Sequence, residues 1–483
     1  MAGEGLTDDL TQTRAGAVGA PALGNAVGNA LGTTASDTVG STLGDTVELL
    51  RELVRAACVN DGTVGSGQEV RGVRVLQRFL AQAVQRGSLE VQVFEAAPGR
   101  ASLVARVRGT DPDAVALGLL GHLDVVPVDV DYWLRDPFGG DLVDGEVWGR
   151  GTVDMLYLTA AFAAVVRDLA LSATRPRGDL VLLAVADEEA GGDYGLKWLL
   201  REHPEAVRVT EVLSETGGMR MGKHVAIDIA EKGSAGRRLV VRGTPGHASV
   251  PYGAESAAIR AGEVLRRLAR VEPAVRLGEL WRPFVSARIS DPALAERLLD
   301  PVRLDAALPE LGKIAGYAHA VSRITISPTV LAAGQSHNVI PGEALIDLDI
   351  RTLPGTTDDE VDEVLAQMLG DLADEVEVRR LHGWPASASP AEDPLFDAVR
   401  RAIAATDGSP VVPIMAAGGS DARYFRELGI PSYGFGLLSR QWNYELYRER
   451  IHAHNERIDV QSVGLTLKAL RRVVADRVLS QVG

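Results

Sequence analysis

The spacing of apolar residues predicts helices at the start of the folded part of the chain and buried strands after them. Apolar side chains recur three and four positions apart between residues 45 and 57, with Asp45 as the expected N-cap, and a second helix is expected over residues 70–86. Apolar runs then alternate with helical stretches: strands over residues 103–107, 115–120 and 180–185, and helices over 159–171 and 195–202. Strands of this kind are buried on both faces, so the pattern predicts an α/β layer protein with a central sheet.

The order of elements changes at about residue 234. The pattern there is strand, helix, strand, strand, helix, strand: residues 238–242, 254–268, 322–330, 344–350, 357–369 and 376–381. This β-α-β-β-α-β order is typical of a small ferredoxin-like α+β unit. It is interrupted by a segment of helical character at about residues 276–318. We therefore expect an inserted domain over residues 234–382.

The α/β pattern resumes after the inserted unit, so the first domain is expected to be discontinuous. A helix is predicted over residues 394–406, strands near 411–415 and 432–436, and a last helix over 460–478. The first domain would then comprise residues 44–233 and 383–483. Residues 1–43 are rich in Gly, Ala, Thr and Ser and predict a flexible tail, with a docked helical arm as the alternative.

Composition narrows the function classes. The 483 residues carry 50 Lys and Arg against 65 Asp and Glu, a formal net charge of −15, which argues against a nucleic-acid binder. The single cysteine, Cys58, lies in an apolar helical pattern and is expected to be a core residue. No apolar run is long enough for a membrane span, and the acidic N-terminal stretch does not resemble a secretory signal, so a cytoplasmic location is expected.

Polar side chains with metal-binding chemistry follow the predicted strands and lie in one late loop. They are His122 and Asp124 after residues 115–120, Asp154 after a run through Trp148, Glu188 and Glu189 after 180–185, Glu215 after Val212-Leu213, and His452 in the last loop. Ligands bind at the carboxyl ends of strands in open α/β sheets. We therefore expect these side chains to gather in one region.

Clustered carboxylates without Lys or Arg partners repel one another, and a multivalent cation is the simplest way to hold them together. Two imidazoles among several carboxylates favour zinc or a similar first-row ion, and two ions sharing one carboxylate would use this set fully. Asp124 is expected to accept the second ring N–H of His122. Either Glu188 or Glu189 would remain as a base.

Plainer interpretations stay open for several of these residues. Asp154 could simply cap the following helix, and Glu188-Glu189 could be a solvated pair in a loop. His454 is an alternative ligand to His452, and His337 an alternative to its neighbour Asn338.

The motifs, taken in order, resemble one family of enzymes. They are His-x-Asp at 122, Gly-Arg-Gly-x-x-Asp at 149, Asp-Glu-Glu at 187, Glu215, Gly-x-x-Gly-His at 243, Asn-Val-Ile-Pro at 338, Gly-Gly-Ser-Asp-Ala-Arg at 418 and His-x-x-Asn-Glu at 452. This set, over about residues 45–475, resembles the zinc amidohydrolases that include acetylornithine deacetylase, succinyl-diaminopimelate desuccinylase, aminoacylase, carboxypeptidase G and the zinc dipeptidases.

The resemblance implies a ligand set and a base. Two zinc ions per subunit, with cobalt or manganese as alternatives, would be held by His122, Asp154 and Glu215 and by His452, Asp154 and Glu189, with Asp154 bridging. Glu188 would be the general base that takes a proton from the metal-bridging water. The Asp154-Met155 peptide would be cis.

The resemblance also implies a substrate class and an assembly. Asn338, Arg351 and Arg423 match positions that contact substrate, and an arginine suits a free carboxylate. His247 of the inserted lid would reach the site of a partner subunit and stabilise the oxyanion, so a homodimer through the lid is expected. The substrate would be a small molecule, an N-acyl amino acid or short peptide whose amide bond lies next to a free carboxylate.

The sequence departs from the family pattern directly after the bridging aspartate. The usual Lys and Gly are replaced by Leu156 and Tyr157, so the following helix is altered and Tyr157 is placed near the site. This departure leaves two alternatives beside hydrolysis: a degenerate member that binds without cleaving, and an enzyme that runs the same chemistry towards amide formation.

Overall fold

The computed structural model describes residues 43–479, so the predicted tail lies outside the described residues except for its last residue. Leu43 is the first residue of helix α2 (Leu43–Arg55) and packs against the main core. The helix therefore begins before Asp45, which lies in its first turn and binds Arg167 instead of capping. Within residues 43–479, none of the helices combines the length and apolar character needed to cross a lipid bilayer.

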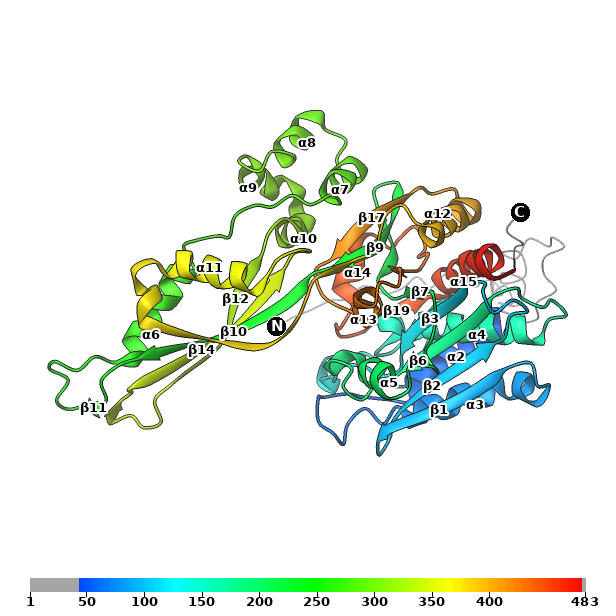
Figure 1. The fold of residues 1–483 in the computed structure, drawn as a ribbon, viewed down its shortest axis with the longest axis horizontal. Helices are drawn as coiled ribbons and strands as arrows, with labels where there is room; N and C mark the ends of the chain where they lie inside the picture. The colour runs from blue at the N-terminus through cyan, green and yellow to red at the C-terminus, as the bar shows by residue number, and fades with distance from the viewer. Residues whose placement is uncertain (1–42, 480–483) are drawn as a thin grey trace, which may run out of the picture. The chain divides into compact units, whose positions relative to one another are not determined.

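A six-stranded mixed sheet forms the centre of the first predicted domain (Figure 1). Its order is β1 (Glu90–Ala97), β2 (Arg100–Val107), β6 (Asp179–Val185), β3 (Ala116–His122), β7 (Glu211–Ser214) and β18 (Ser432–Gly434). The last four strands are parallel, and β1 and β2 are antiparallel additions. The expected α/β class is therefore confirmed. The four parallel strands also bring their carboxyl ends to the same edge of the sheet.

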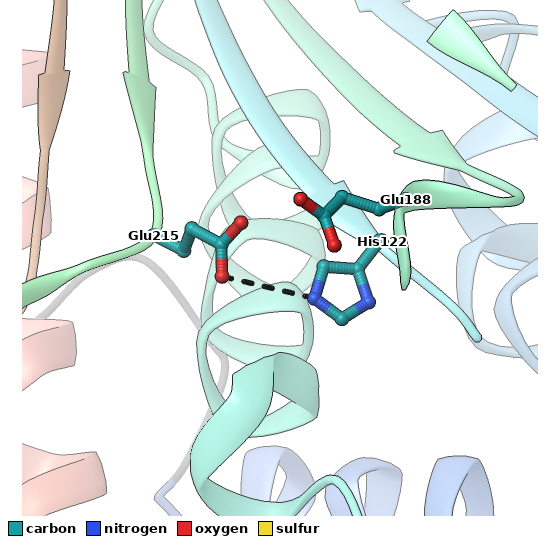
Figure 2. Close-up of side chains that lie close together, drawn as sticks. All are labelled: His122, Glu188 and Glu215. Atoms are coloured by element: carbon teal, nitrogen blue, oxygen red, sulfur yellow. Dashed lines mark ion pairs between the residues drawn. The ribbon is translucent and has the colours of Figure 1, made fainter. Parts of the chain in front are cut away.

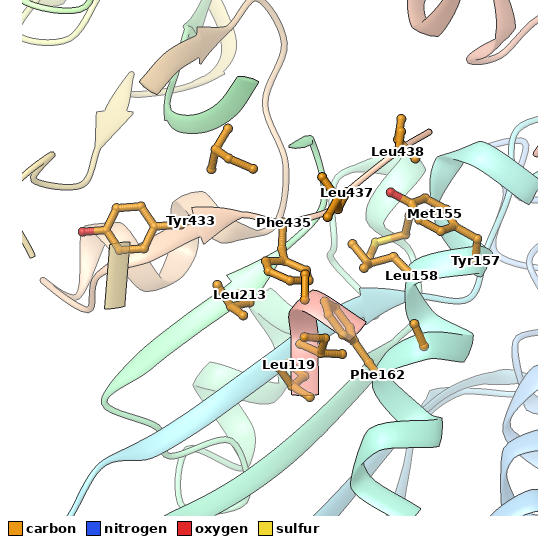
Figure 3. Close-up of a cluster of buried hydrophobic side chains, with 14 of the residues drawn as sticks. Leu119, Met155, Tyr157, Leu158, Phe162, Leu213, Tyr433, Phe435, Leu437 and Leu438 are labelled. Atoms are coloured by element: carbon orange, nitrogen blue, oxygen red, sulfur yellow. The ribbon is translucent and has the colours of Figure 1, made fainter. Parts of the chain in front are cut away.

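Helices α3 (Val70–Gln85) and α4 (Tyr157–Leu171) pack directly on this sheet, and α5 (Leu196–Glu202) shares a hydrophobic cluster with it. Helices α2 and α15 (Val460–Val474) pack on α4, and α12 (Pro394–Asp407) packs on α15. Helix α4 is buried on nearly every side, which explains why its sequence is apolar almost throughout. Figure 3 shows part of the resulting core, where Met155, Tyr157 and Phe162 lie near Phe435 and Leu437.

Two smaller sheets complete this part of the chain. One has the order β16 (Ser387–Ala388), β9 (His224–Glu231) and β17 (Val411–Ala416), with β8 (Gly217–Met221) paired to β9. The other joins β19 (Arg457–Asp459), β5 (Glu146–Trp148) and β4 (Asp141–Val143), and Asp144-Gly145 form the hairpin turn between β4 and β5. Strand β9 was not predicted from the sequence. It pairs in parallel with β17, so two segments that lie far apart in the sequence are neighbours in this sheet.

A separate four-stranded antiparallel sheet follows directly on β9. Its order is β12 (Thr325–Ala333), β14 (Glu343–Thr352), β10 (Gly233–Arg242) and β15 (Val376–Trp384). Helices α6 (Ala257–Leu268) and α11 (Asp358–Leu369) share a hydrophobic cluster with β10 and β14 that is distinct from the main core. The β-α-β-β-α-β order expected from the sequence is therefore present, with α6 starting three residues later than predicted.

The helical segment within this unit packs differently from the sheet that flanks it in sequence. It contains α7 (Trp281–Arg288), α8 (Pro292–Leu298), α9 (Leu304–Ala307) and α10 (Ala315–Val321). Trp281, Phe284 and Tyr317 belong to the main hydrophobic core together with residues of β9 and β17. Tyr317 also donates a hydrogen bond to the Met415 carbonyl of β17 at 2.9 Å. The segment therefore packs on the β9–β17 sheet, which the sequence did not predict.

Candidate active site

Five segments of the chain place imidazole and carboxylate groups around one another. His122 ends β3, and its Nε2 lies 3.2 Å from Asp154 Oδ1 and 3.8 Å from Glu215 Oε2. His452 Nε2 lies 3.0 Å from Asp154 Oδ2 and 3.2 Å from Glu189 Oε1. The two oxygens of Asp154 therefore face different imidazoles. Figure 2 shows the carboxylates of Glu215 and Glu188 close to the His122 ring, with the ion pair between Glu215 and His122 marked.

The loop that carries Asp154 is fixed by a buried carboxylate. Glu456 accepts hydrogen bonds from the backbone N–H groups of Gly151, Val153 and Asp154 and from the Arg150 guanidinium. The Asp154-Met155 peptide is cis, as expected, and Met155 packs into the core. The sequence contained Glu456 within the His-x-x-Asn-Glu motif, but only the fold shows that it supports a loop three hundred residues earlier.

Asp124 has a different contact from the one expected. The Nδ1 of His122 lies 2.9 Å from the backbone carbonyl of Asp124, whereas the carboxylate oxygen is 3.7 Å away. The carboxylate instead accepts hydrogen bonds from the backbone N–H groups of Glu188 and Glu189. Asp124 thus orients His122 with its main chain and fixes the Glu188-Glu189 turn with its side chain.

A buried ionic network lies behind that turn. Asp187 adopts a left-handed conformation (φ 67°) and accepts hydrogen bonds from Arg100 and Asn60. Arg100 also binds Glu69, and Asn60 also binds Asp124. Burial raises the pKa of Glu69 to about 7 even though Arg100 lies beside it. Through Asp187 and Asp124, this network supports the turn that carries Glu188 and Glu189. Its members Asn60, Glu69 and Arg100 were not singled out from the sequence.

The electrostatics of the cluster favour positive charge. Burial and the neighbouring Asp154 raise the pKa of Glu215 to about 8, and burial together with Glu215 raises the pKa of Glu188 well above its usual value. Burial disfavours a charged imidazole, but Asp154 and Glu189 outweigh it and raise the pKa of His452 to about 10. Protons are thus retained where the carboxylates crowd together, as expected of a site built for cations.

Two groups of ligand atoms are close enough to hold a metal ion. One joins His122, Glu188 and Glu215, and the other joins His122, Asp154 and Glu189, with all ligand atoms of a group within 4.8 Å of one another. Histidine nitrogen combined with carboxylate oxygen is a ligand set that zinc and related first-row ions accept. The residues present therefore fit the expected metals. His454 stacks instead on the Tyr132 ring, so its position does not favour it as a ligand.

The cluster opens into a cavity of about 270 Å³. Its lining includes Asp154, Glu188, Glu189, Glu215 and His452, together with the glycine-rich residues 416–420 and the side chains of Tyr317, Met415 and Tyr444. The buried Asp228 also lines it, and burial raises the pKa of this carboxyl to about 8. Asp228 was not singled out from the sequence, because a lone aspartate within an unpredicted strand gives no signal.

Two of the residues expected to bind substrate lie against the same tryptophan ring. The guanidinium carbons of Arg351 and Arg423 lie 5.5 and 4.8 Å from the Trp384 ring centre. The Trp384 Nε1 atom is buried without a hydrogen-bond partner, and Gly419 is so close that a Cβ there would lie 3.0 Å from it. Trp384 was missed because nothing near it in sequence points to a site, although it ends a strand directly before Pro385.

The remaining predicted residues lie outside the cavity lining. Strand β11 (Gly246–His247) pairs with β13 (Val339–Ile340), so the two motifs singled out from the sequence lie side by side. His247 is exposed, and its Nδ1 accepts a hydrogen bond from the Ser249 N–H. The Asn338 side chain contacts Ser336, and His337 is likewise exposed. Neither His247 nor Asn338 lines the cavity formed by the described residues.

A mixed α/β fold whose parallel strands end in a cluster of imidazoles and paired carboxylates defines a metal-dependent hydrolase. The chain belongs to peptidase family M20/M25/M40, whose model matches residues 118–476. The matched residues include the four-stranded sheet and the segments that precede and follow it in the sequence. It identifies the chain as a metallopeptidase-type enzyme that hydrolyses amide bonds, and an interpretation as a non-catalytic binding protein is not favoured.

Relatives of known name agree with this class. The chain is 27% identical over 409 residues to the N-fatty-acyl-amino acid synthase/hydrolase PM20D1 of Xenopus tropicalis, covering 81% of this chain and 78% of that protein. It is 28% identical over 370 residues to a succinyl-diaminopimelate desuccinylase of Cereibacter sphaeroides, covering 74% and 82%.

Solved structures share the fold. The M20 family metallo-carboxypeptidase Sso-CP2 from Sulfolobus solfataricus gives a TM-score of 0.68 at 18% identity, covering 89% of this chain and 98% of that one. Human carnosine dipeptidase 1 gives a TM-score of 0.64 at 18% identity, covering 95% and 99%. At this level of identity, the likeness concerns the fold alone.

Proposed function

We propose that this enzyme cleaves an amide bond next to a free carboxylate, in an N-acyl amino acid or a short peptide. The observation that carries the proposal is Asp154, whose two oxygens face the imidazoles of His122 and His452 while Glu188 lies beside the same space. The relatives named above include an enzyme of N-fatty-acyl amino acids and a desuccinylase, which supports an acylated amino acid as substrate.

Five residues would hold two metal ions. His122 and Glu215 would serve one, His452 and Glu189 the other, and Asp154 would bind both. Bound metal ions would polarise the scissile carbonyl and make water acidic enough to attack at neutral pH. Zinc fits the donor set best, with cobalt and manganese as alternatives.

Glu188 would be the general base in this proposal. Its carboxylate lies within ligand distance of His122 and Glu215, yet the other five residues already complete two sites, so Glu188 is left for proton transfer. A base must hold a proton transiently and release it to the leaving amine. Burial and Glu215 raise the pKa of Glu188 well above its usual value, which favours its holding the transferred proton.

Arg351 and Arg423 would bind the substrate carboxylate. The Arg423 side chain is buried and donates hydrogen bonds to Tyr424 and the Ser420 carbonyl, while Arg351 is half-buried and pairs with its neighbour Asp349. Both guanidinium groups lie against Trp384, which in turn lies beside Gly419 of the cavity lining. Arginine recognises a carboxylate through two parallel hydrogen bonds, which gives the site both affinity and orientation.

We further propose that residues 234–382 act as a lid and dimerisation domain. In a homodimer, His247 and Asn338 would enter the site of the partner subunit, since both are exposed at the paired β11–β13 segment. Mixing inactive Glu188→Gln and His247→Ala proteins tests this. In a shared site, mixed dimers recover measurable activity because one of their two sites is intact, whereas independent monomers recover none.

A substrate panel tests the main proposal. Metal-loaded enzyme is assayed on N-acyl amino acids, on dipeptides and on the matching C-terminal amides, with zinc, cobalt and manganese. We expect turnover of the free acids at kcat/KM at least tenfold above the amides, and two metal ions per chain by elemental analysis. Equal rates for acids and amides, or less than one bound ion per chain after loading, would contradict the proposal.

A further inference from the structure

An apolar cavity of about 440 Å³ lies next to the metal-site cavity. Its lining consists mainly of buried hydrophobic side chains from β9, β17 and the helical segment, including Ile229, Trp281, Phe284, Val321 and Ile414. Cavities of this size are in the usual range for small-molecule sites. The cavity is open on one side, where Arg276 and Glu279 belong to its lining, so a ligand can enter it from solvent.

The two cavities share a wall. Tyr317 and Met415 line both of them, and the Tyr317 hydroxyl donates a hydrogen bond to the Met415 carbonyl at 2.9 Å. The Tyr317 ring contacts Phe284 on the apolar side and Tyr444, which lines the metal-site cavity. Tyr317 and Met415 therefore belong to a wall that the apolar cavity shares with the metal-site cavity.

The chain passes the two cavities in order at the end of β17 and in the segment after it. Met415 borders the apolar cavity, residues 416–420 line the metal-site cavity, and Arg423 follows with Trp384 beside it. Gly419 lies four positions after Met415, a span of at most about 14 Å. A substrate with its carboxylate near the arginines and its amide at the metal cluster would thus direct its acyl group towards Tyr317.

We propose that the apolar cavity binds the aliphatic acyl chain of an N-acyl amino acid, and that Tyr317 forms the wall past which the chain enters. This inference rests on the proposed function and specifies its substrate as one with a long acyl chain. Each methylene buried there strengthens binding about fourfold, so a few methylenes compensate for loss of the Tyr317 hydrogen bond.

The test is a chain-length series on the zinc-loaded enzyme, with acetyl, butanoyl, hexanoyl and decanoyl glycine. Wild type is expected to gain at least thirtyfold in kcat/KM from acetyl to decanoyl. Ala391→Trp fills the cavity from the bend after β16, and should lower kcat/KM at least tenfold for decanoylglycine while changing acetylglycine less than twofold. Ala114→Trp, in a turn before β3 and outside both cavities, is the control for added bulk.

A second variant guards against misfolding. Leu277→Asn places a polar group in the cavity from a segment without helix or strand, and should also reduce the preference for long chains. A wild-type profile that is flat with chain length, or an Ala391→Trp profile like that of wild type, overturns the proposal. If no acylglycine is hydrolysed, the proposed function fails, and calorimetric binding of decanoylglycine then tests the cavity alone. Tight binding to wild type that is lost in Ala391→Trp supports the proposed acyl-chain site. Equal binding to both proteins, or no binding to either, refutes it.

Discussion

Carboxylates have opposite surroundings in the two main parts of this enzyme. On the four-stranded sheet they pair with arginines across strands, as Asp347 does with Arg238, and the arginine lowers the pKa of Asp347. At the metal cluster, Glu188 and Glu215 form no ion pair with an arginine among residues 43–479, and burial raises the pKa of both. The sheet neutralises its charges internally, whereas the cluster needs a cation from outside, and this difference marks it as the site of chemistry.

The largest expected effect is loss of turnover in Glu188→Gln. If Glu188 moves the proton, the amide side chain keeps the shape but removes the base, and kcat should fall about 10³-fold. Steady-state kinetics with elemental analysis of the same sample measure this, and two metal ions per chain should remain. The matched variant Glu189→Gln should instead lose metal. Full activity in Glu188→Gln would assign the base to another group.

The metal-free protein should lose stability as pH rises. Glu215 keeps its proton in the folded state up to about pH 8, whereas the unfolded chain releases it near its usual value of 4.5, so folding binds a proton between these values. His452, with a pKa of about 10 against 6.5, acts in the same direction at higher pH. Each buried group of this kind contributes a slope of about 1.4 kcal/mol per pH unit.

Thermal unfolding at pH 5, 6.5 and 8 checks this, with and without a chelator. The melting temperature of the chelated protein should fall steadily over this range. The metal-loaded protein should fall less, because bound cations replace the protons. Identical pH profiles for the two samples would mean that the cluster does not hold the metal.

The sequence predicted the reacting groups better than their supports. His122, Asp154, Glu188, Glu189 and Glu215 follow strands or a hairpin, and parallel strands necessarily end at one edge, so local pattern and sheet topology suffice to gather them. The inserted sheet was likewise predicted, because its period and element order are local properties.

The supports depend on contacts that no local pattern encodes. Arg100 bridges Glu69 and Asp187, and Glu456 fixes a loop three hundred residues away, so each partner alone resembles an ordinary surface charge in the sequence. Asp124 was expected to bind His122 with its carboxylate, which the fold uses instead for the N–H groups of Glu188 and Glu189. Backbone donors that appear only on folding compete for the same acceptor, and spacing cannot decide between them.

A moderate effect is expected from a change on the four-stranded sheet at a residue that is proposed to bind substrate. Arg351, at the end of β14, is proposed to bind the substrate carboxylate together with Arg423. Arg351→Gln should raise KM for an N-acyl amino acid about 10- to 100-fold, because a charge-assisted hydrogen bond is lost, and change kcat less. KM for the corresponding amide should stay nearly constant. An equal rise for acid and amide would indicate that Arg351 only supports the fold.

The smallest effect should come from the exposed charges of the four-stranded sheet. Glu343 binds Arg242 at 2.7 Å, but both side chains are about half exposed, with 45% and 57% of their surface open to solvent. Water screens such a pair and the side chains lose freedom in forming it, so Glu343→Gln should move the melting temperature by about 1 °C or less. The buried counterpart Glu69→Gln removes a partner of Arg100 where no water can replace it, and should destabilise the fold by about 3 kcal/mol or more. Differential scanning calorimetry of both variants compares them directly. Equal losses would show that burial does not increase the cost of breaking an ion pair in this protein, and would contradict the prediction.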